Sequence, residues 1–208
     1  MMMNNKALLS TAYLPPVQYF SKLATYDEIW IEAHENYLKQ TYRNRCVIYG
    51  ANGKLALSIP VKKISTKTRI RDIAIDYDTN WQKMHWKSIE SAYRSSAFFE
   101  FYADDLAPFY HTRYQFLFDF NHDLIMKLAE QLELTIDLSF TDRYYFPGDH
   151  PMDDYRGSIH PKQKVNDQDF KVREYFQVFS EKYGFIPNLS ILDLLFNTGP
   201  EAKEYLVQ

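Results

Sequence analysis

The chain has 208 residues, the length of one ordinary domain. Its net charge of −3 comes from 24 Lys and Arg against 27 Asp and Glu, so it lacks the basic character expected of a protein that binds duplex DNA or an anionic membrane. The single cysteine, Cys46, excludes an internal disulfide and a multi-cysteine zinc site. The sequence shows no secretory signal pattern and no apolar run of roughly 18–20 residues. We therefore expect a cytoplasmic protein without membrane insertion.

The first third of the sequence predicts strands. Apolar and polar residues alternate over Asp27–Ala33, which is typical of a half-buried strand. The Asn52-Gly53 pair between two apolar runs is a strong hairpin signal. The strands predicted in this region are Ala7–Leu14, Asp27–Ala33, Cys46–Tyr49, Lys54–Val61 and Ile70–Ile75.

The middle and the end of the sequence predict helices. Trp81, His85 and Ile89 recur every four residues, and Asn80 stands where an N-cap is expected. The predicted helices are Val17–Ala24, Trp81–Ser95, Phe98–Leu106, Phe116–Leu132 and Leu189–Phe196, the last ended by the stop signal Asn197–Pro200. Leu134–Leu138 is a further predicted strand, and Glu174–Phe179 fits a strand or a helix.

Residues 141–168 are polar and rich in Asp, Pro and Gly, with little periodicity. A loop of this length in a compact domain is usually functional or disordered. Strands come first in the chain, helices follow, and the last part is mixed. This order predicts an α/β or α+β fold in a single domain over residues 1–208, with a mixed sheet of N-terminal strands and hairpin covered by helices.

The densest polar segment is 32–45, which carries Lys39, Arg43 and Arg45, with Asn44 between the arginines. Arginine offers a planar fork of donors that suits carboxylate or phosphate. The segment therefore predicts binding of an anionic substrate such as a nucleotide sugar. The alternative is a solvated connection with ordinary surface charges.

Three further groups could carry chemistry. His85 next to Trp81 on one helix face is a candidate general base, or else a histidine packed at the edge of the core. Asp193 lies inside an apolar helix and needs partners, for which an arginine of segment 43–45 is a candidate. Asp149–Asp154 with His160 could ligate a metal, but the spacing matches no metal motif, so we expect none.

With these segments placed, the sequence resembles the WbqC-like family of bacterial proteins over nearly its whole length. The motifs that carry the resemblance are Tyr13-Leu14-Pro15, Tyr19–Leu23, Lys39–Arg45, Leu57–Val61, Trp81–Trp86, Phe98–Tyr102 and Leu189–Pro200. Three departures stand out, one of which is that the stretch expected to be Asp-rich ahead of Lys39 reads Glu32-Ala33-His34-Glu35. The stretch where relatives carry a His-Gln-Pro type motif reads Ser10-Thr11-Ala12 here, and a middle segment of longer relatives is reduced to residues 141–168.

The resemblance implies a cytoplasmic protein, and some relatives are associated with bacterial surface-polysaccharide (O-antigen) biosynthesis. It favours a transferase that acts on an amino sugar or a nucleotide sugar and moves an acyl or aminoacyl group, without a cofactor. In this hypothesis Arg43, Asn44, Arg45 and Asp193 bind substrate, and Tyr13 with Trp81 forms an aromatic wall. His85 is the general base, and Lys39 neutralises developing charge.

A second hypothesis is a non-catalytic binding or scaffold protein. Its aromatic residues would build the core and a partner surface, and Arg43 with Asp193 would form a structural ion pair. Nucleic-acid binding comes third, because the net charge is negative and no RNA-binding motif is evident. The partner expected from the sequence is therefore a small sugar derivative and not a nucleic acid.

Overall fold

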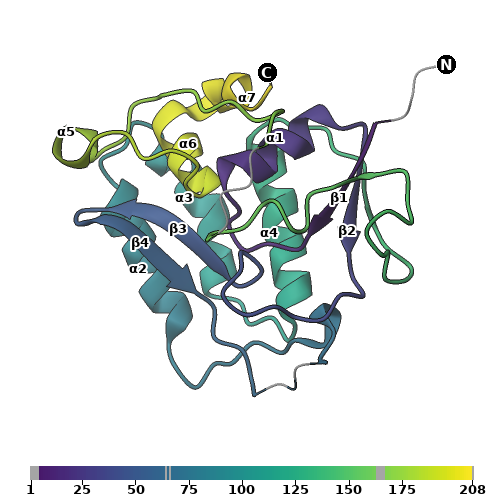
Figure 1. The fold of residues 1–208 in the computed structure, drawn as a ribbon. Helices are drawn as coiled ribbons and strands as arrows, with labels where there is room; N and C mark the ends of the chain where they lie inside the picture. Colours follow the sequence, from purple (N-terminus) through teal and green to yellow (C-terminus); the bar gives the residue numbers. More distant parts are fainter. Residues whose placement is uncertain (1–4, 64, 66, 163–166, 208) are drawn as a thin grey trace.

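Four short strands form a parallel sheet in the order β5-β2-β1-β6, and Figure 1 labels its two central strands, β1 and β2. The computed structural model describes residues 5–63, 65, 67–162 and 167–207. The central strand β1 is apolar and fully buried at Ala7, Leu8 and Leu9, as expected of a parallel strand covered on both faces. The strands are β1 (Lys6–Ser10), β2 (Glu28–Glu32), β5 (Leu138–Phe140) and β6 (Asp153–Asp154).

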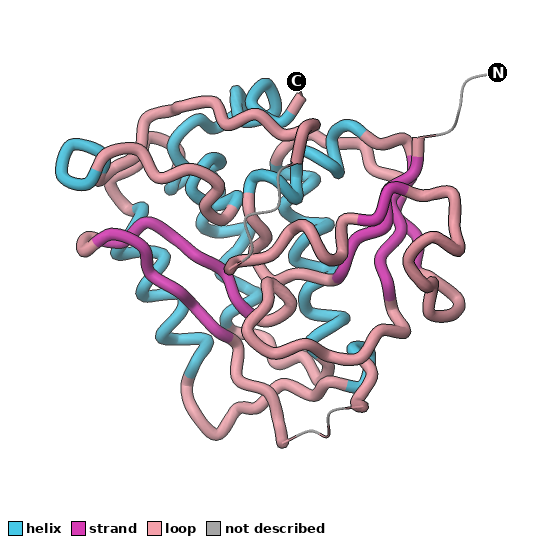
Figure 2. The backbone as a smooth tube through the Cα atoms, in the orientation of Figure 1, coloured by secondary structure: helices cyan, strands magenta, loops and turns pink. Residues whose placement is uncertain are grey.

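The hairpin β3 (Arg45–Gly50) and β4 (Gly53–Ser58) forms a separate antiparallel sheet (Figure 2). Gly53 has φ +95°, which favours glycine and explains why Asn-Gly marks this turn. The predicted mixed α/β class is confirmed, with the correction that the hairpin is a sheet of its own and not part of one mixed sheet.

Helices pack against both sheets. Helix α4 meets β5 through the rings of Phe118 and Phe140, whose centroids lie 5.1 Å apart. Helix α2 meets β3 through the Tyr93 hydroxyl, which accepts a 3.1 Å hydrogen bond from the Tyr49 backbone N–H. The helices are α1 (Val17–Thr25), α2 (Trp81–Tyr93), α3 (Phe99–Leu106), α4 (Leu117–Gln131), α5 (Ser180–Tyr183), α6 (Ile191–Thr198) and α7 (Ala202–Leu206), and the short 3₁₀ turns are η1 (Ile70–Asp72), η2 (Ala107–Tyr110) and η3 (Gly199–Glu201).

An aromatic cluster joins the segment after β1 to α2 and α4. The ring of Phe120 lies 5.8 Å from that of Trp81 and 5.9 Å from that of Tyr13, measured between centroids. All three side chains are nearly or fully buried. Aromatic pairs at this spacing add about 0.5–1.5 kcal/mol each beyond the burial of their surface. The high aromatic content of the sequence is therefore used in part to build this core.

Several predicted elements differ in the structure. Ile70–Ile75 is not a strand: it begins with η1, and only single bridges at Ala74 and Ile75 pair it with other segments. Strand β1 ends at Ser10 and not at Leu14, because the Tyr13 N–H bonds to the Tyr42 carbonyl. The Asn80 side chain makes no capping hydrogen bond to α2.

The last third of the chain also departs from expectation. The strand predicted over Leu134–Leu138 begins at Leu138, because the Leu134 N–H still bonds back to the end of α4. The predicted loop 141–168 contains strand β6; residues 163–166 of that loop lie outside the described residues. Residues 174–179 form neither strand nor helix. None of the helices within the described residues is both long enough and apolar enough to cross a membrane.

Candidate functional site

The strands β1, β2 and β6 end in polar side chains at one edge of the parallel sheet. Ser10, Glu32 and Asp154 are their last residues, and the strands run in the same direction. The chain adds β2 and β5 on one side of β1 and then returns to place β6 on the other side. Open α/β sheets bind ligands outside the carboxyl ends of their strands where the order reverses in this way. This edge is therefore the candidate site.

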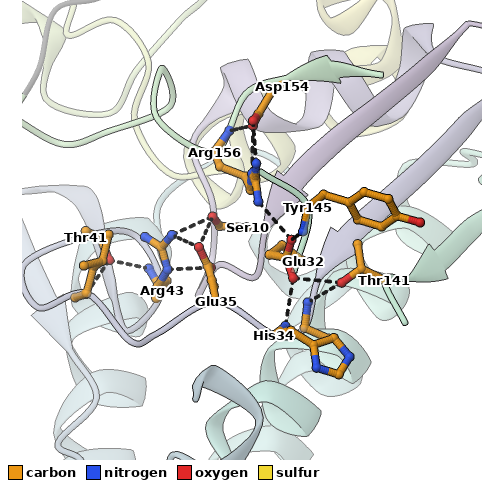
Figure 3. A network of polar contacts seen from close by, with 12 residues as sticks. Ser10, Glu32, His34, Glu35, Thr41, Arg43, Thr141, Tyr145, Asp154 and Arg156 are labelled. Atoms are coloured by element: carbon orange, nitrogen blue, oxygen red, sulfur yellow. Dashed lines mark hydrogen bonds and ion pairs between the residues drawn. The ribbon is translucent and has the colours of Figure 1, made fainter. Parts of the chain in front are cut away.

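Arg43 and Glu35 form a buried ion pair beside the end of β1 (Figure 3). The Arg43 Nε and Nη2 atoms donate to the two Glu35 carboxylate oxygens at 2.8 and 2.5 Å. Arg43 Nη2 also donates to the Ser10 hydroxyl at 2.7 Å, and that hydroxyl donates to Glu35 at 3.3 Å. The two-pronged geometry fixes the guanidinium plane. The segment between β2 and β3 is thereby tied to the end of β1.

Glu32 is the centre of a second group of contacts at the end of β2. Its side chain is fully buried, and its oxygens accept four hydrogen bonds. The donors are the His34 N–H at 2.8 Å, the Thr141 hydroxyl at 2.9 Å, the Tyr145 N–H at 3.1 Å and Arg156 Nη1 at 2.9 Å (Figure 3). These four contacts fix the position of the Glu32 carboxylate, which in turn orients Arg156.

Arg156 is held from a second side by Asp154 of β6. Its Nε and Nη2 atoms donate to the two Asp154 oxygens at 2.9 and 2.6 Å. Burial raises the pKa of the Asp154 carboxyl, but the hydrogen bonds from Arg156 outweigh it and hold the pKa below its usual value. Burial lowers the pKa of the Arg156 guanidinium, and Asp154 more than restores it. Both groups are therefore ionised at neutral pH.

A small cavity lies between the two arginines. It holds about 10 Å³, close to the space that one water molecule requires. The charged residues that line it are Arg43 and Arg156, while their carboxylate partners are not among the lining residues. The remaining lining residues are Leu9, Ser10, Thr11, Ala12, Tyr19, Tyr42, Tyr155 and Ile159. The cavity thus presents guanidinium donors and a hydroxyl, an arrangement that suits an anionic or oxygen-rich ligand.

The described part of the chain contains no group of three or more His, Cys, Asp or Glu side chains placed to hold a metal ion. His160 lies near the site, where burial, Arg43 and Lys162 together lower the pKa of its imidazole. The Lys162 ammonium bonds to the Gln40 side chain. The segment that follows β6 is thereby tied to the segment that carries Arg43.

The cationic segment predicted from the sequence divides in the structure. Arg43 lines the cavity, whereas Arg45 begins β3 and donates from Nε to the Ser58 hydroxyl at 3.0 Å. Asn44 donates to the Ile59 carbonyl at 2.8 Å, and Lys39 is exposed. Arg43 is thus the member of this segment that the structure places in the site, and binding of substrate by Asn44, Arg45 or Lys39 stays a prediction.

His85, Trp81 and Tyr13 lie together in the core and do not line the cavity. The His85 Nδ1 atom is 2.9 Å from the Tyr13 hydroxyl, which is 3.0 Å from the Tyr110 hydroxyl. Burial lowers the pKa of His85 to about 4, although a hydrogen bond with the Ser58 backbone acts in the opposite direction. The imidazole is therefore neutral at pH 7, and its role as a general base stays a prediction.

The expected Arg43–Asp193 ion pair is wrong. Arg43 pairs with Glu35, while Asp193 accepts hydrogen bonds from the Tyr175 hydroxyl at 2.8 Å and the Gln177 amide at 2.7 Å. Asp193 is fully buried in α6 among neutral partners. Helix α6 packs against α1. The residues that contact the Asp193 carboxylate, Tyr175 and Gln177, lie in the segment that precedes α5. Binding of substrate by Asp193 is not tested by these contacts.

Sequence reasoning missed most of the site. No functional role was predicted for Glu32, Glu35 or Ser10. Arg156 lies inside the stretch that was predicted to be a polar loop. One signal was available, because Glu32 is the next-to-last residue of the predicted strand Asp27–Ala33 and the carboxyl ends of parallel strands gather functional groups. Using it required knowing that the strands are parallel, which no local pattern showed.

Comparisons with known proteins agree with the resemblance noted in the sequence. The model of the WbqC-like protein family matches residues 11–156 and 160–205. An uncharacterised protein of Mycobacterium tuberculosis, Rv1507c, is 30% identical over 233 aligned positions that cover 98% of each chain. A comparison with solved structures found no match. The sequence match extends over both the edge network and the aromatic core, and the chain therefore belongs to the WbqC-like protein family.

Proposed function

We propose that this protein is a transferase that binds a phosphate-bearing amino sugar or nucleotide sugar at the carboxyl edge of the parallel sheet. The observation that carries the proposal is the pair of arginines, Arg43 and Arg156, that line the cavity at the point where the strand order reverses. The role in surface-polysaccharide assembly, and the acyl or aminoacyl group as the group moved, rest on the resemblance to the WbqC-like family.

The carboxylates behind the arginines support ligand binding and do not exclude it. Glu35 and Asp154 each take a two-pronged contact, which leaves further N–H donors of each guanidinium for a ligand. A guanidinium that is already oriented loses less conformational freedom on binding. Arg43 and Arg156 are therefore pre-organised donors for phosphate oxygens, and Ser10 lines the cavity beside Arg43.

Ligand entry requires part of the site to move. The cavity of about 10 Å³ does not admit a sugar. Tyr155 and Ile159 line it from the segment that follows β6, and Ile159 is only half-buried. The Tyr155 N–H is bonded to the Leu8 carbonyl of β1, so the entry path we propose is movement at Ile159, which leaves Arg156 and the sheet in place.

The test is calorimetric titration with N-acetylglucosamine 1-phosphate and with a panel of nucleotide sugars. Replacing one arginine removes charge-assisted hydrogen bonds worth about 1.5–3 kcal/mol each, so Arg156→Gln should weaken binding roughly 10- to 150-fold. Arg113→Gln is the matched control, because Arg113 lies 5.0 Å over the Tyr77 ring and does not line the cavity. Absence of binding by all ligands, or equal binding by both variants, would overturn the proposal.

One observation favours the second function, a non-catalytic binding or scaffold protein. The Arg43–Glu35 pair is buried, and the cavity as it stands is too small for a substrate. In this alternative Arg43→Ala leaves Glu35 unpaired and costs about 3–5 kcal/mol of stability. Arg156→Lys separates the two functions, because it keeps the positive charge and removes the planar fork. Loss of ligand affinity at unchanged melting temperature supports the ligand site on which the transferase depends, and loss of stability without any ligand binding supports the scaffold.

A further inference from the structure

Two aromatic side chains stand exposed beside the edge network. Tyr144 and Phe146 follow β5 and are 38% and 62% exposed. Their ring centroids are 5.0 Å apart with an angle of 89° between the planes. Single exposed aromatics are ordinary on a protein surface. Two perpendicular rings form a corner, in which a flat group can stack on one ring and meet the edge of the other.

This corner is attached to the cavity through Arg156. The Arg156 guanidinium carbon lies 5.2 Å from the centre of the Tyr144 ring, within the range of a cation–π contact. The backbone N–H of the intervening Tyr145 donates to Glu32, so the same carboxylate that orients Arg156 also holds the loop. The aromatic corner and the phosphate-binding arginine are therefore fixed relative to each other.

We infer that the ligand of the edge site is a nucleotide, whose base stacks in the corner of Tyr144 and Phe146 while its phosphates contact Arg156. This inference rests on the proposed function and narrows it to the nucleotide-linked form of the sugar. The chemistry that favours it is the pairing of a flat apolar surface with an adjacent cation. A nucleotide carries a flat ring and an anion on one molecule, whereas a sugar phosphate lacks the ring.

The experiment compares ligands with and without a base. Uridine diphosphate, adenosine diphosphate and inorganic pyrophosphate are titrated into the full chain and into Tyr144→Ala and Phe146→Ala variants. Stacking on an aromatic side chain strengthens binding by roughly 5- to 150-fold per base. We expect the nucleoside diphosphates to bind more tightly than pyrophosphate by this factor, and each alanine variant to weaken the nucleotides while pyrophosphate affinity stays the same.

Two variants serve as controls. Tyr144→Phe keeps the ring and should keep nucleotide affinity. Phe101→Ala removes another exposed ring, 75% exposed on α3, and should change no affinity.

Three outcomes overturn the inference or the function beneath it. Equal affinity for pyrophosphate and nucleotides, with Arg156-dependent binding retained, overturns the nucleotide and leaves the proposed function standing. An equal loss for N-acetylglucosamine 1-phosphate in Phe146→Ala means that the corner holds the sugar ring, which also overturns the nucleobase. Absence of binding by every phosphate-bearing ligand overturns the proposed function itself.

Discussion

Asp193 is a buried carboxyl group without a charged partner. Its Oδ2 atom accepts from Tyr175 and Gln177, while Oδ1 has no hydrogen-bond partner among the described residues. Burial raises the pKa of Asp193 from an ordinary 3.8 to about 6, against the opposing effect of these hydrogen bonds. An acid whose pKa is higher in the folded state binds more protons when folded. Its ionisation therefore destabilises the fold as the pH rises.

We therefore expect Asp193→Asn to increase the stability of the fold in a pH-dependent way. The change removes the ionisation, so the variant should become more stable relative to the natural protein as the pH rises from 4 to 7. The difference is about 2–3 kcal/mol, from 1.36 kcal/mol per pKa unit, and it levels off above pH 7. Urea unfolding of both proteins across this range measures it. A stability difference that stays constant with pH contradicts the prediction.

At the scale of elements, the end of α6 depends on one glycine. Gly199 has φ +57°, a conformation that side-chain-bearing residues rarely adopt, and it follows the last residue of the helix. A Cβ atom built on Gly199 lies 2.5 Å from a carbon of the Phe98 ring. The stop signal in the sequence is thus a close-packed turn that fixes α6 against the start of α3.

Gly199→Ala should therefore be strongly destabilising. Backbone strain of about 1–2 kcal/mol adds to overpacking of about 1–3 kcal/mol, so we expect a loss of at least about 2 kcal/mol in the free energy of unfolding. Gly157→Ala is the matched control, because no heavy atom lies within 4 Å of its added Cβ. Chemical denaturation of both variants measures the effect. Equal stability of the two would show that Phe98 moves aside without cost.

At the scale of the molecule, His85 joins the two sheets. It projects from α2, contacts Tyr13 beyond the end of β1, and hydrogen-bonds to the Ser58 backbone of the hairpin. Its side chain is 5% exposed, so protonation places a charge between these parts. A base whose pKa is lower in the folded state binds fewer protons when folded, so its contribution to stability is lost as the pH falls.

We expect the natural protein to lose stability relative to His85→Gln between pH 6.5 and pH 4. The window follows from burial, which lowers the His85 pKa from 6.5 to about 4, and the loss is roughly 3 kcal/mol at its lower end. Glutamine keeps an acceptor for Tyr13 and cannot take up a proton. Thermal or urea unfolding at several pH values measures the difference. Parallel stability curves for the two proteins would exclude protonation of His85 as a cause of acid unfolding.

Most helices and strands could be predicted from local sequence patterns. The Asn-Gly turn, the four-residue repeat of Trp81, His85 and Ile89, and the glycine that ends α6 each reflect an interaction between near neighbours, and these three predicted features are present. The motifs also placed the chain in its family. Predictions from local patterns were wrong where long-range contacts determine the secondary structure. Ile70–Ile75, for example, alternates like a strand but lacks a continuous partner strand.

The residues of the candidate site are brought together only by long-range contacts. Ser10 ends β1, Glu35 and Arg43 lie in the segment between β2 and β3, and Arg156 comes from a part of the chain more than a hundred residues away. They meet because β6 returns to the far side of β1, and no local spacing encodes that pairing. The predicted Arg43–Asp193 pair rested on opposite charge alone. In the structure Arg43 pairs with Glu35 instead. The physical reason is that a buried charge takes the partner that topology brings within hydrogen-bonding distance.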